Sequence, residues 1–125
     1  MHASSATPPT PIQCACLLTA AALTLELFHL GAQPVAVGLF AAPWDKLAHF
    51  ACFGAITGLL WIGTAGRMPV VIVLAAIAIG ALDELHQGAL PGRIADVLDL
   101  LVDAVAAVTV ACVMLAYESH QKTRL

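Results

Sequence analysis

The chain has 125 residues, of which 61% are hydrophobic and 10% are charged. Because an average soluble domain is roughly 45–50% apolar and roughly 25% charged, the five Lys/Arg and eight Asp/Glu residues are too few to cover a soluble helical core. The composition therefore excludes a water-soluble globular protein, the length allows one domain, and the scattered basic residues exclude a nucleic-acid-binding surface.

The first part of the chain is predicted to be a tail followed by a membrane span. Residues 1–12 are rich in Ser, Thr and Pro, so we expect a flexible tail. Residues 13–31 form an apolar run close to the roughly 20 residues that cross a bilayer. Without a basic stretch before it or a small-residue cleavage site after it, this run is expected to remain as an anchor. Its polar residues Glu26 and His29 either join the polar cluster described below or reach towards the membrane surface at its edge, and we favour the second.

Three further spans are predicted. Residues 32–43 contain Pro and Gly and predict an interfacial loop or a short re-entrant piece. The apolar runs that follow predict spans at 44–64, 69–88 and 95–117, and a solvated tail at 118–125. Trp44 and Trp61 lie near opposite ends of the second span, as is typical of aromatic residues at the two membrane surfaces. The fold class is therefore an all-α membrane protein, a bundle of four transmembrane helices.

The distribution of basic residues indicates an orientation. Four spans place both termini and the turn at Arg67 on one side of the membrane, and the two other connections on the opposite side. The terminal side carries Arg67, Lys122 and Arg124, against Lys46 and Arg93 on the other side. Because cytoplasmic segments carry an excess of Lys and Arg, we expect the termini to be cytoplasmic.

The cysteines are interpreted as small apolar residues. All four lie in apolar stretches, at Cys14, Cys16, Cys52 and Cys112. Cys14 and Cys16 could bind a soft metal, but no second pair and no histidine motif lies beside them. We therefore do not expect a thiolate metal site.

Polar residues gather where the second span begins and where the third ends, two places that the topology puts at one membrane face. Asp45 and His49 are four residues apart, and Lys46 and His49 three apart, so all three can face one neighbour. On the third span, Asp83 shares a face with Gln87, whereas Glu84 is turned by about 100°. We therefore expect one of these two acids to face inward.

The fourth span adds three acids at the same membrane face. Asp96, Asp99 and Asp103 are spaced three and four residues apart and form one stripe. An ionised acid at the centre of a membrane helix costs about 2.5–3.5 kcal/mol, so the stripe needs partners or water. Lys46, Arg93 and His49 are the available partners.

Two interpretations of this polar cluster stay open. In one, ion pairs only hold three helices together; in the other, the cluster is a polar pocket open to the outer surface. Acids outnumber bases, so a protonated acid or a bound cation is expected. Asp, Glu and His could hold a divalent cation, Mg²⁺ through oxygens or Zn²⁺ with histidine, although no HExxH motif is present. No serine with a nearby base lies at this face, which argues against a serine triad.

Three segments resemble motifs of the VanZ family. They are WDKLAHF at 44–50, DELHQ at 83–87 and PGRIADVLD at 91–99. They correspond to a DKxxHF segment that opens one helix of that family, a DExxQ segment that closes the next, and a GRxxxxxD segment that opens the last. The sequence departs from the pattern at Asp103, where relatives usually carry Asn, and at Ala106, where they usually carry Gly.

The resemblance nominates the site residues by motif position. With Asp103 from the acidic stripe, the candidate site comprises Asp45, Lys46, His49, Asp83, Glu84, Gln87, Arg93, Asp99 and Asp103. The resemblance also implies a protein of the bacterial cytoplasmic membrane and an association with resistance to the glycopeptide teicoplanin. It implies no defined reaction, so whether the protein is an enzyme stays open.

Three functional hypotheses follow. The first is a binding or accessory protein of the cell envelope that engages membrane lipids, such as a lipid-linked envelope precursor or a glycolipid. The second is a small, metal-dependent membrane enzyme that acts on a lipid phosphate. The third is a structural helix bundle or a small transport element in which the ion pairs only support the fold.

Overall fold

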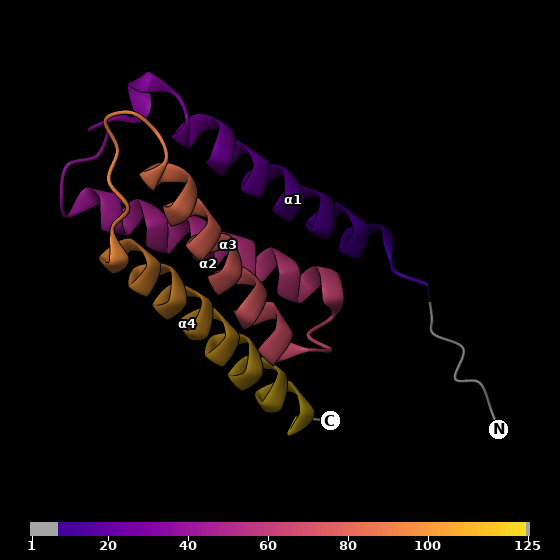
Figure 1. Ribbon diagram of the computed structural model, residues 1–125. Coiled ribbons are helices and arrows are strands. Elements are labelled where there is room, and N and C mark those ends of the chain that lie inside the picture. Colours follow the sequence, from indigo (N-terminus) through magenta and orange to yellow (C-terminus); the bar gives the residue numbers. More distant parts are fainter. Residues whose placement is uncertain (1–7, 125) are drawn as a thin grey trace.

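The structure is a computed structural model that describes residues 8–124. Within these residues it consists of helices and contains no strand (Figure 1). The elements are α1 (Pro11–Gly31), the short 3-10 helix η1 (Pro34–Ala36), α2 (Trp44–Thr64), α3 (Pro69–Gly88) and α4 (Val97–Lys122). The prediction of an all-α protein with four long helices is confirmed.

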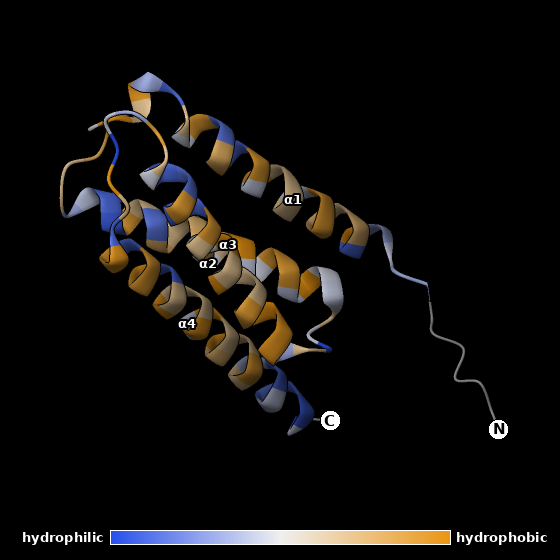
Figure 2. Cartoon of the chain, viewed as in Figure 1, coloured by the Kyte–Doolittle hydropathy of each residue, from blue (hydrophilic) through white to orange (hydrophobic). Residues whose placement is uncertain are grey.

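Each of the four α-helices is long and apolar enough to cross a membrane. They have 21, 21, 20 and 26 residues, and about 20 residues span the hydrocarbon core. Apolar residues lie along most of their length, as Figure 2 shows in orange. Many large apolar side chains are exposed on the outside of the bundle, for example Leu18, Leu85 and Val97. Such a surface suits lipid better than water, and the chain is a multi-pass membrane protein.

Local capping explains where the first and last helices begin. Thr10 and Gln13 form a reciprocal capping box, and Pro11 occupies the first turn of α1. Helix α1 therefore starts two residues before the predicted span, and most of the predicted tail, residues 1–7, lies outside the described residues. Asp96 is the N-cap of α4 because its side chain accepts a hydrogen bond from the Leu98 N–H. Helix α4 therefore begins at Val97 rather than at residue 95.

The other bounds also bear on the predicted spans. Helices α2 and α3 occupy the residues expected from the apolar runs. Helix α4 continues to Lys122, beyond the predicted end at residue 117. His120 and Lys122 lie in its last turn, where cations interact favourably with the helix dipole. The segment 32–43 contains only the single turn of η1.

The interior of the bundle is formed mainly by α2, α3 and α4. Helix α2 packs along both α4 and α1, and α4 also packs along α3. Trp61, Ile72 and Ala111 form a buried cluster from three helices. Helix α1 lies at the periphery and buries only Ala20. It approaches α2 closely at Gly63, where a Cβ atom would lie 2.6 Å from Leu17 Cγ.

The helix connections define two ends of the bundle. The start of α1, the end of α4 and the α2–α3 turn lie at one end, and the segments 32–43 and 89–96 lie at the other (Figure 1). The turn is made by Ala65 and Gly66, whose φ angles are 55° and 62°. Trp61 is 1% exposed and donates a hydrogen bond to Glu118 Oε1 at 2.7 Å. Its ring therefore packs inside the bundle, at the end of α2 next to this turn, because its side of α2 faces α4.

Candidate functional site

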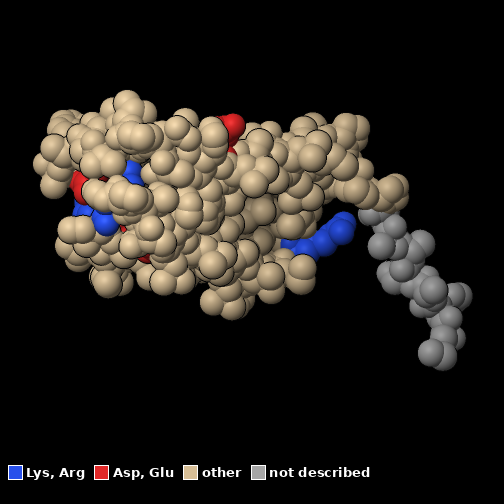
Figure 3. All heavy atoms as spheres, turned by 45° about the horizontal axis from the view of Figure 1, so that its top comes forward, with Lys and Arg blue, Asp and Glu red and all other residues tan. Residues whose placement is uncertain are grey.

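Most of the charged residues of α2, α3 and α4 lie at the end of the bundle that carries the segments 32–43 and 89–96, whereas Glu118 and Lys122 lie near the opposite end. Figure 2 shows hydrophilic residues at the start of α2 and in the α3–α4 connection. On the face drawn in Figure 3, blue and red atoms lie together at one end, a separate blue group lies near the opposite end and a red group at the upper edge, and the rest of the described surface is tan. The structure therefore brings the predicted polar cluster together from α2, α3 and α4.

Lys46 on α2 is surrounded by three carboxylates. Its Nζ lies 2.5 Å from Asp96 Oδ2, 2.6 Å from Asp99 Oδ1 and 3.1 Å from Asp45 Oδ2. The lysine side chain is only 23% exposed. These contacts tie the start of α2 to the first turn of α4.

His49 lies one turn deeper and connects α2 to the buried part of the acidic stripe. Its Nδ1 lies 3.0 Å from Asp103 Oδ1, and its Nε2 lies 3.8 Å from Asp99 Oδ2. Asp103 is fully buried. Space for its carboxylate comes from Gly80 on α3, where a Cβ atom would lie 2.7 Å from Asp103 Oδ2.

Asp83, Gln87 and Arg93 form a hydrogen-bonded chain from α3 into the α3–α4 connection. Gln87 Nε2 donates to Asp83 Oδ2 at 2.8 Å, and Arg93 Nη2 donates to Gln87 Oε1 at 2.6 Å. Among residues 8–124, Arg93 forms no salt bridge with a carboxylate. Its positive charge therefore remains available to a ligand.

Asp83 and Glu84 both face the interior. Asp83 is 0% exposed and Glu84 is 6% exposed, so the expectation that only one of them faces inward is wrong. Glu84 Oε2 accepts a hydrogen bond from the Asp96 N–H at 2.7 Å. The segment before α4 thus covers the side of α3 that carries Glu84, an arrangement that helical periodicity does not reveal.

Several buried carboxylate oxygens have no hydrogen-bond partner among the described residues. They are Asp45 Oδ1, Asp83 Oδ1, Glu84 Oε1 and Asp103 Oδ2. Leaving a buried polar group unpaired costs about 1–3 kcal/mol, and more for a charged group. The cluster therefore has unused capacity to bind a cation, water or a donor group of a ligand.

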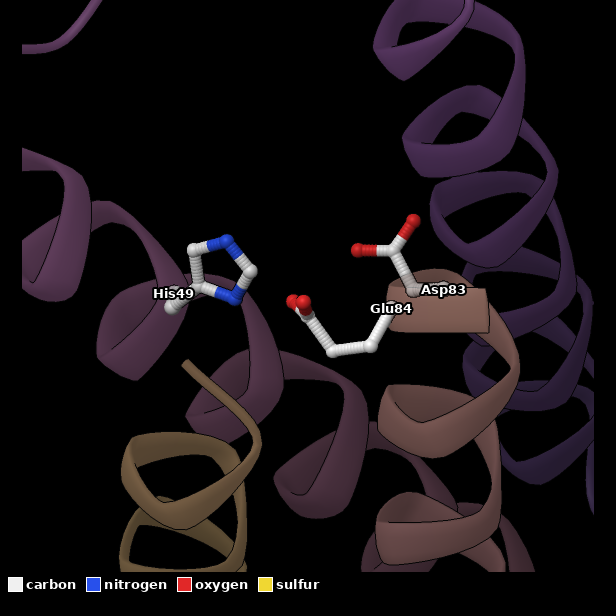
Figure 4. Close-up of side chains that lie close together, drawn as sticks. All are labelled: His49, Asp83 and Glu84. Carbon is white, nitrogen blue, oxygen red and sulfur yellow. The ribbon is translucent and has the colours of Figure 1, made fainter. Parts of the chain in front are cut away.

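Two groups of side chains have the spacing of metal ligands. His49, Asp83 and Glu84 each offer an atom within 4.8 Å of the others, and Figure 4 shows the two carboxylates pointing from α3 towards the histidine on α2. Asp45, Asp96 and Asp99 form the second group. That second group already surrounds the ammonium group of Lys46.

A cavity of about 650 Å³ lies beside the cluster. Its polar lining residues include His49, Gln87, Arg93 and Asp99, together with the acids Glu26, Asp45 and Asp96. Most of the lining residues from α1 and the segment 32–43 are apolar, among them Leu23, Leu27, Leu30, Val35 and Phe40. The cavity thus combines a charged wall with an apolar wall.

Helix α1 also contributes a charged residue to this cavity. Glu26 lines it, which agrees with the alternative that we favoured less for the polar residues of the first span. His29 is exposed and is not among the lining residues.

Asp96 is a member of the cluster that is missing from the predicted site. The acidic stripe includes Asp96, but this residue lies outside the motif positions that the resemblance nominates. The Lys46 ammonium group and the Leu98 N–H hold the pKa of Asp96 below its usual range. Asp96 is three residues from Asp99, a spacing that puts both on one face of a helix, and this spacing is the sequence signal for adding Asp96 to the candidate site.

Comparisons with known proteins give one family match. Residues 9–121 match the family model described as VanZ/LLP1, which is nearly the whole chain. Neither the curated proteins nor the solved structures contain a match.

Proposed function

The chain belongs to the VanZ/LLP1 family, and we propose that it is a binding or accessory protein of the bacterial cell envelope. In this proposal the cavity binds the polar headgroup of a membrane lipid, such as a lipid-linked envelope precursor or a glycolipid. The observation that carries the proposal is the pairing of a charged wall with an apolar wall in one cavity of about 650 Å³. Sites for amphiphilic molecules need both kinds of surface.

Within the charged wall, Arg93 is the group that can bind an anion, of which a phosphate is the simplest case. Glu26, Asp45, Asp96 and Asp99 line the same cavity, so the headgroup must also offer hydrogen-bond donors or arrive with a cation. Arg93 lines the cavity, and within the described residues its guanidinium group is paired only with the amide of Gln87. Guanidinium groups bind phosphate through parallel hydrogen bonds. The apolar side chains of α1 are positioned to contact the first part of an acyl or prenyl chain.

We place the protein in the bacterial cytoplasmic membrane with its termini in the cytoplasm. The excess of basic residues on the terminal side supports this orientation. The cavity would then open towards the extracytoplasmic side, where envelope precursors are assembled into the wall. Headgroup binding at that surface is consistent with an accessory role in envelope synthesis.

Lipid binding by the purified protein tests the headgroup proposal. Native mass spectrometry from detergent would compare a polyprenyl phosphate with a neutral diacylglycerol as ligands. We expect the phosphate lipid to bind better and Arg93→Gln to weaken its binding at least tenfold. Arg67→Gln removes a cation from the opposite end and serves as the matched control. Equal binding of the phosphate lipid by wild type and Arg93→Gln would contradict the proposal.

A link to teicoplanin resistance is a separate part of the proposal, supported by the family membership. Expression of the chain in a teicoplanin-susceptible bacterium is expected to raise the minimal inhibitory concentration. The Asp99→Asn variant should lose this effect, because Asp99 both lines the cavity and binds Lys46. If expression of the chain left the minimal inhibitory concentration of the susceptible host unchanged, the link to teicoplanin resistance would be rejected.

A second candidate function is a small membrane enzyme that acts on a lipid phosphate. His49 lines the cavity while its Nδ1 lies 3.0 Å from Asp103 Oδ1, and a histidine oriented by a carboxylate is a common general acid or base. Incubation of the purified protein with polyprenyl phosphates and diphosphates, with and without divalent metals, tests this candidate. Turnover that disappears in His49→Gln supports an enzyme, and its absence across these substrates supports the binding role.

A further inference from the structure

We infer that His49, Asp83 and Glu84 form a binding site for one divalent metal ion between α2 and α3. Their ligand atoms lie within 4.8 Å of one another, and Figure 4 shows all three side chains converging on one space. Metal bonds of about 2.0–2.2 Å would draw the three groups slightly closer. This metal site is separate from the proposed headgroup binding, because its three ligands are protein side chains and need no bound lipid.

The hydrogen bonds of the two acids leave one oxygen of each free for a ligand. Asp83 Oδ2 is held by the Gln87 side chain, and Glu84 Oε2 is held by the Asp96 N–H. The remaining oxygens, Asp83 Oδ1 and Glu84 Oε1, are buried and accept no hydrogen bond from the described residues. Carboxylates that bind a metal are usually held in place by a hydrogen bond to one oxygen, which leaves the other oxygen for the metal. A buried oxygen without a partner is explained by such an ion.

The histidine is oriented in a similar way. Its Nδ1 lies 3.0 Å from Asp103 Oδ1, and an Nδ1–H that donates there leaves Nε2 with a free lone pair. Metal-binding histidines usually donate their second ring N–H to a carboxylate or a carbonyl. Asp103 therefore acts as a positioning residue for His49.

The charge of the cluster also calls for a cation. Six carboxylates meet at this end of the bundle, against the permanent positive charges of Lys46 and Arg93. Lys46 binds the group formed by Asp45, Asp96 and Asp99, so that group needs no metal. His49, Asp83 and Glu84 have no lysine or arginine salt bridge within residues 8–124.

The ligand set indicates the kind of metal. One imidazole and two carboxylates suit Mn²⁺ or Zn²⁺ better than Mg²⁺, which prefers oxygen ligands and water. Three protein ligands leave coordination positions open, as in catalytic metal sites. If the proposed headgroup binding holds, a phosphate oxygen could take one of these positions, and this last step rests on that proposal.

Titration with Mn²⁺ tests the metal site. Electron paramagnetic resonance of the full-length protein in detergent measures free Mn²⁺, and electron spin echo modulation detects a nitrogen bound to it. We expect one Mn²⁺ per chain with nitrogen modulation from His49. Glu84→Gln keeps a carbonyl acceptor for the Asp96 N–H but removes the charge, and it should weaken binding at least tenfold.

Matched variants make the result specific. Glu118→Gln is the same change at the opposite end of the bundle, keeps an acceptor for Trp61, and should bind Mn²⁺ as wild type does. Asp83→Asn replaces the second acid and is expected to weaken binding at least tenfold if Glu84→Gln does not fold. Size-exclusion chromatography and thermal unfolding identify folded variants.

The outcomes separate the metal site from headgroup binding. No stoichiometric Mn²⁺ or Zn²⁺ binding, no nitrogen modulation, or equal binding by the two site variants and wild type would overturn the metal site. Binding of a polyprenyl phosphate that persists in EDTA would leave the headgroup proposal standing after such a result. Stoichiometric Mn²⁺ binding without any lipid binding would support the metal site and remove the headgroup proposal.

Discussion

Lys46 carries the largest set of ion pairs in the described part of the chain. Its ammonium group contacts Asp45, Asp96 and Asp99, and the last of these is 8% exposed. Taking such charges out of water costs several kcal/mol per ion, a cost that close ion pairs with good geometry offset. The lysine is therefore the residue that permits an acidic stripe to begin inside a membrane helix.

Replacement of Lys46 by Met is expected to destabilise the protein by about 2–3 kcal/mol. This is below the 3–5 kcal/mol typical of a fully buried pair, because the lysine side chain is 23% exposed. Thermal unfolding in detergent measures the change. Lys46→Arg keeps the charge and serves as the control. A Lys46→Met variant as stable as wild type would show that the three acids do not depend on the lysine.

A double variant separates a structural role of this pair from a functional one. Adding Asp99→Asn to Lys46→Met removes both charges of one pair, so part of the lost stability should return. If the pair only supports the fold, lipid binding should return with stability. We expect stability to recover while polyprenyl phosphate binding stays weak, because Asp99 also lines the cavity. Full recovery of both would favour the structural helix bundle.

Helix α3 approaches α4 closely where the site is deepest. Gly80 on α3 faces the side chain of Asp103, and both residues are buried. The absence of a side chain at Gly80 allows the carboxylate to lie between the helices and to reach His49 on α2. One glycine therefore sets the position of a charged group shared by three helices.

Gly80→Ala is expected to destabilise the protein by about 1–3 kcal/mol, the usual cost of overpacking. The added Cβ would lie 2.7 Å from Asp103 Oδ2 and 3.2 Å from Asp103 Cβ. Gly54→Ala in α2 is the matched control, because its nearest neighbour would be Val110 Cγ2 at 3.6 Å. That control should be neutral or gain about 0.5–1 kcal/mol from helix propensity. Equal thermal stability of the two variants would contradict the close packing at Gly80.

The molecule as a whole is polarised along the bundle. The polar cluster and the cavity lie at the end with the segments 32–43 and 89–96, and the start of α1 and the end of α4 lie at the opposite end. Because four consecutive helices alternate in direction, the termini of the bundle lie at the end opposite to the segments 32–43 and 89–96. The orientation in the membrane therefore decides which side of the membrane the cavity faces.

Single cysteines test the proposed orientation. In a background with Cys14, Cys16, Cys52 and Cys112 replaced by Ala, one variant carries Ala89→Cys and another carries Thr123→Cys, and both positions are exposed. With cytoplasmic termini, an impermeant maleimide should label Ala89→Cys in intact spheroplasts and label Thr123→Cys only after lysis. The reverse pattern would place the cavity on the cytoplasmic side.

Local features of the sequence were sufficient for the four helices and for most members of the cluster. Apolar runs of about 20 residues are long enough to cross a bilayer. Because two spans lie between the start of the second helix and the start of the fourth, both starts lie at the same membrane face. The spacing of Asp45 and His49, and of Asp99 and Asp103, follows the helical repeat. These properties depend only on residues close together in the chain.

Tertiary structure decided which side chains meet. The burial of both Asp83 and Glu84, the contact between Asp96 and Lys46, and the place of Glu26 on the cavity all depend on segments far apart in the sequence. Helical periodicity fixes the direction of a side chain around its own axis, but not which neighbour lies in that direction. In this protein the chain before α4 folds over α3, where the Asp96 N–H donates a hydrogen bond to Glu84. Helix α1 contributes most of its cavity-lining residues as apolar side chains. Packing of α2, α3 and α4 therefore assembles the polar cluster, and packing of α1 places apolar residues beside it.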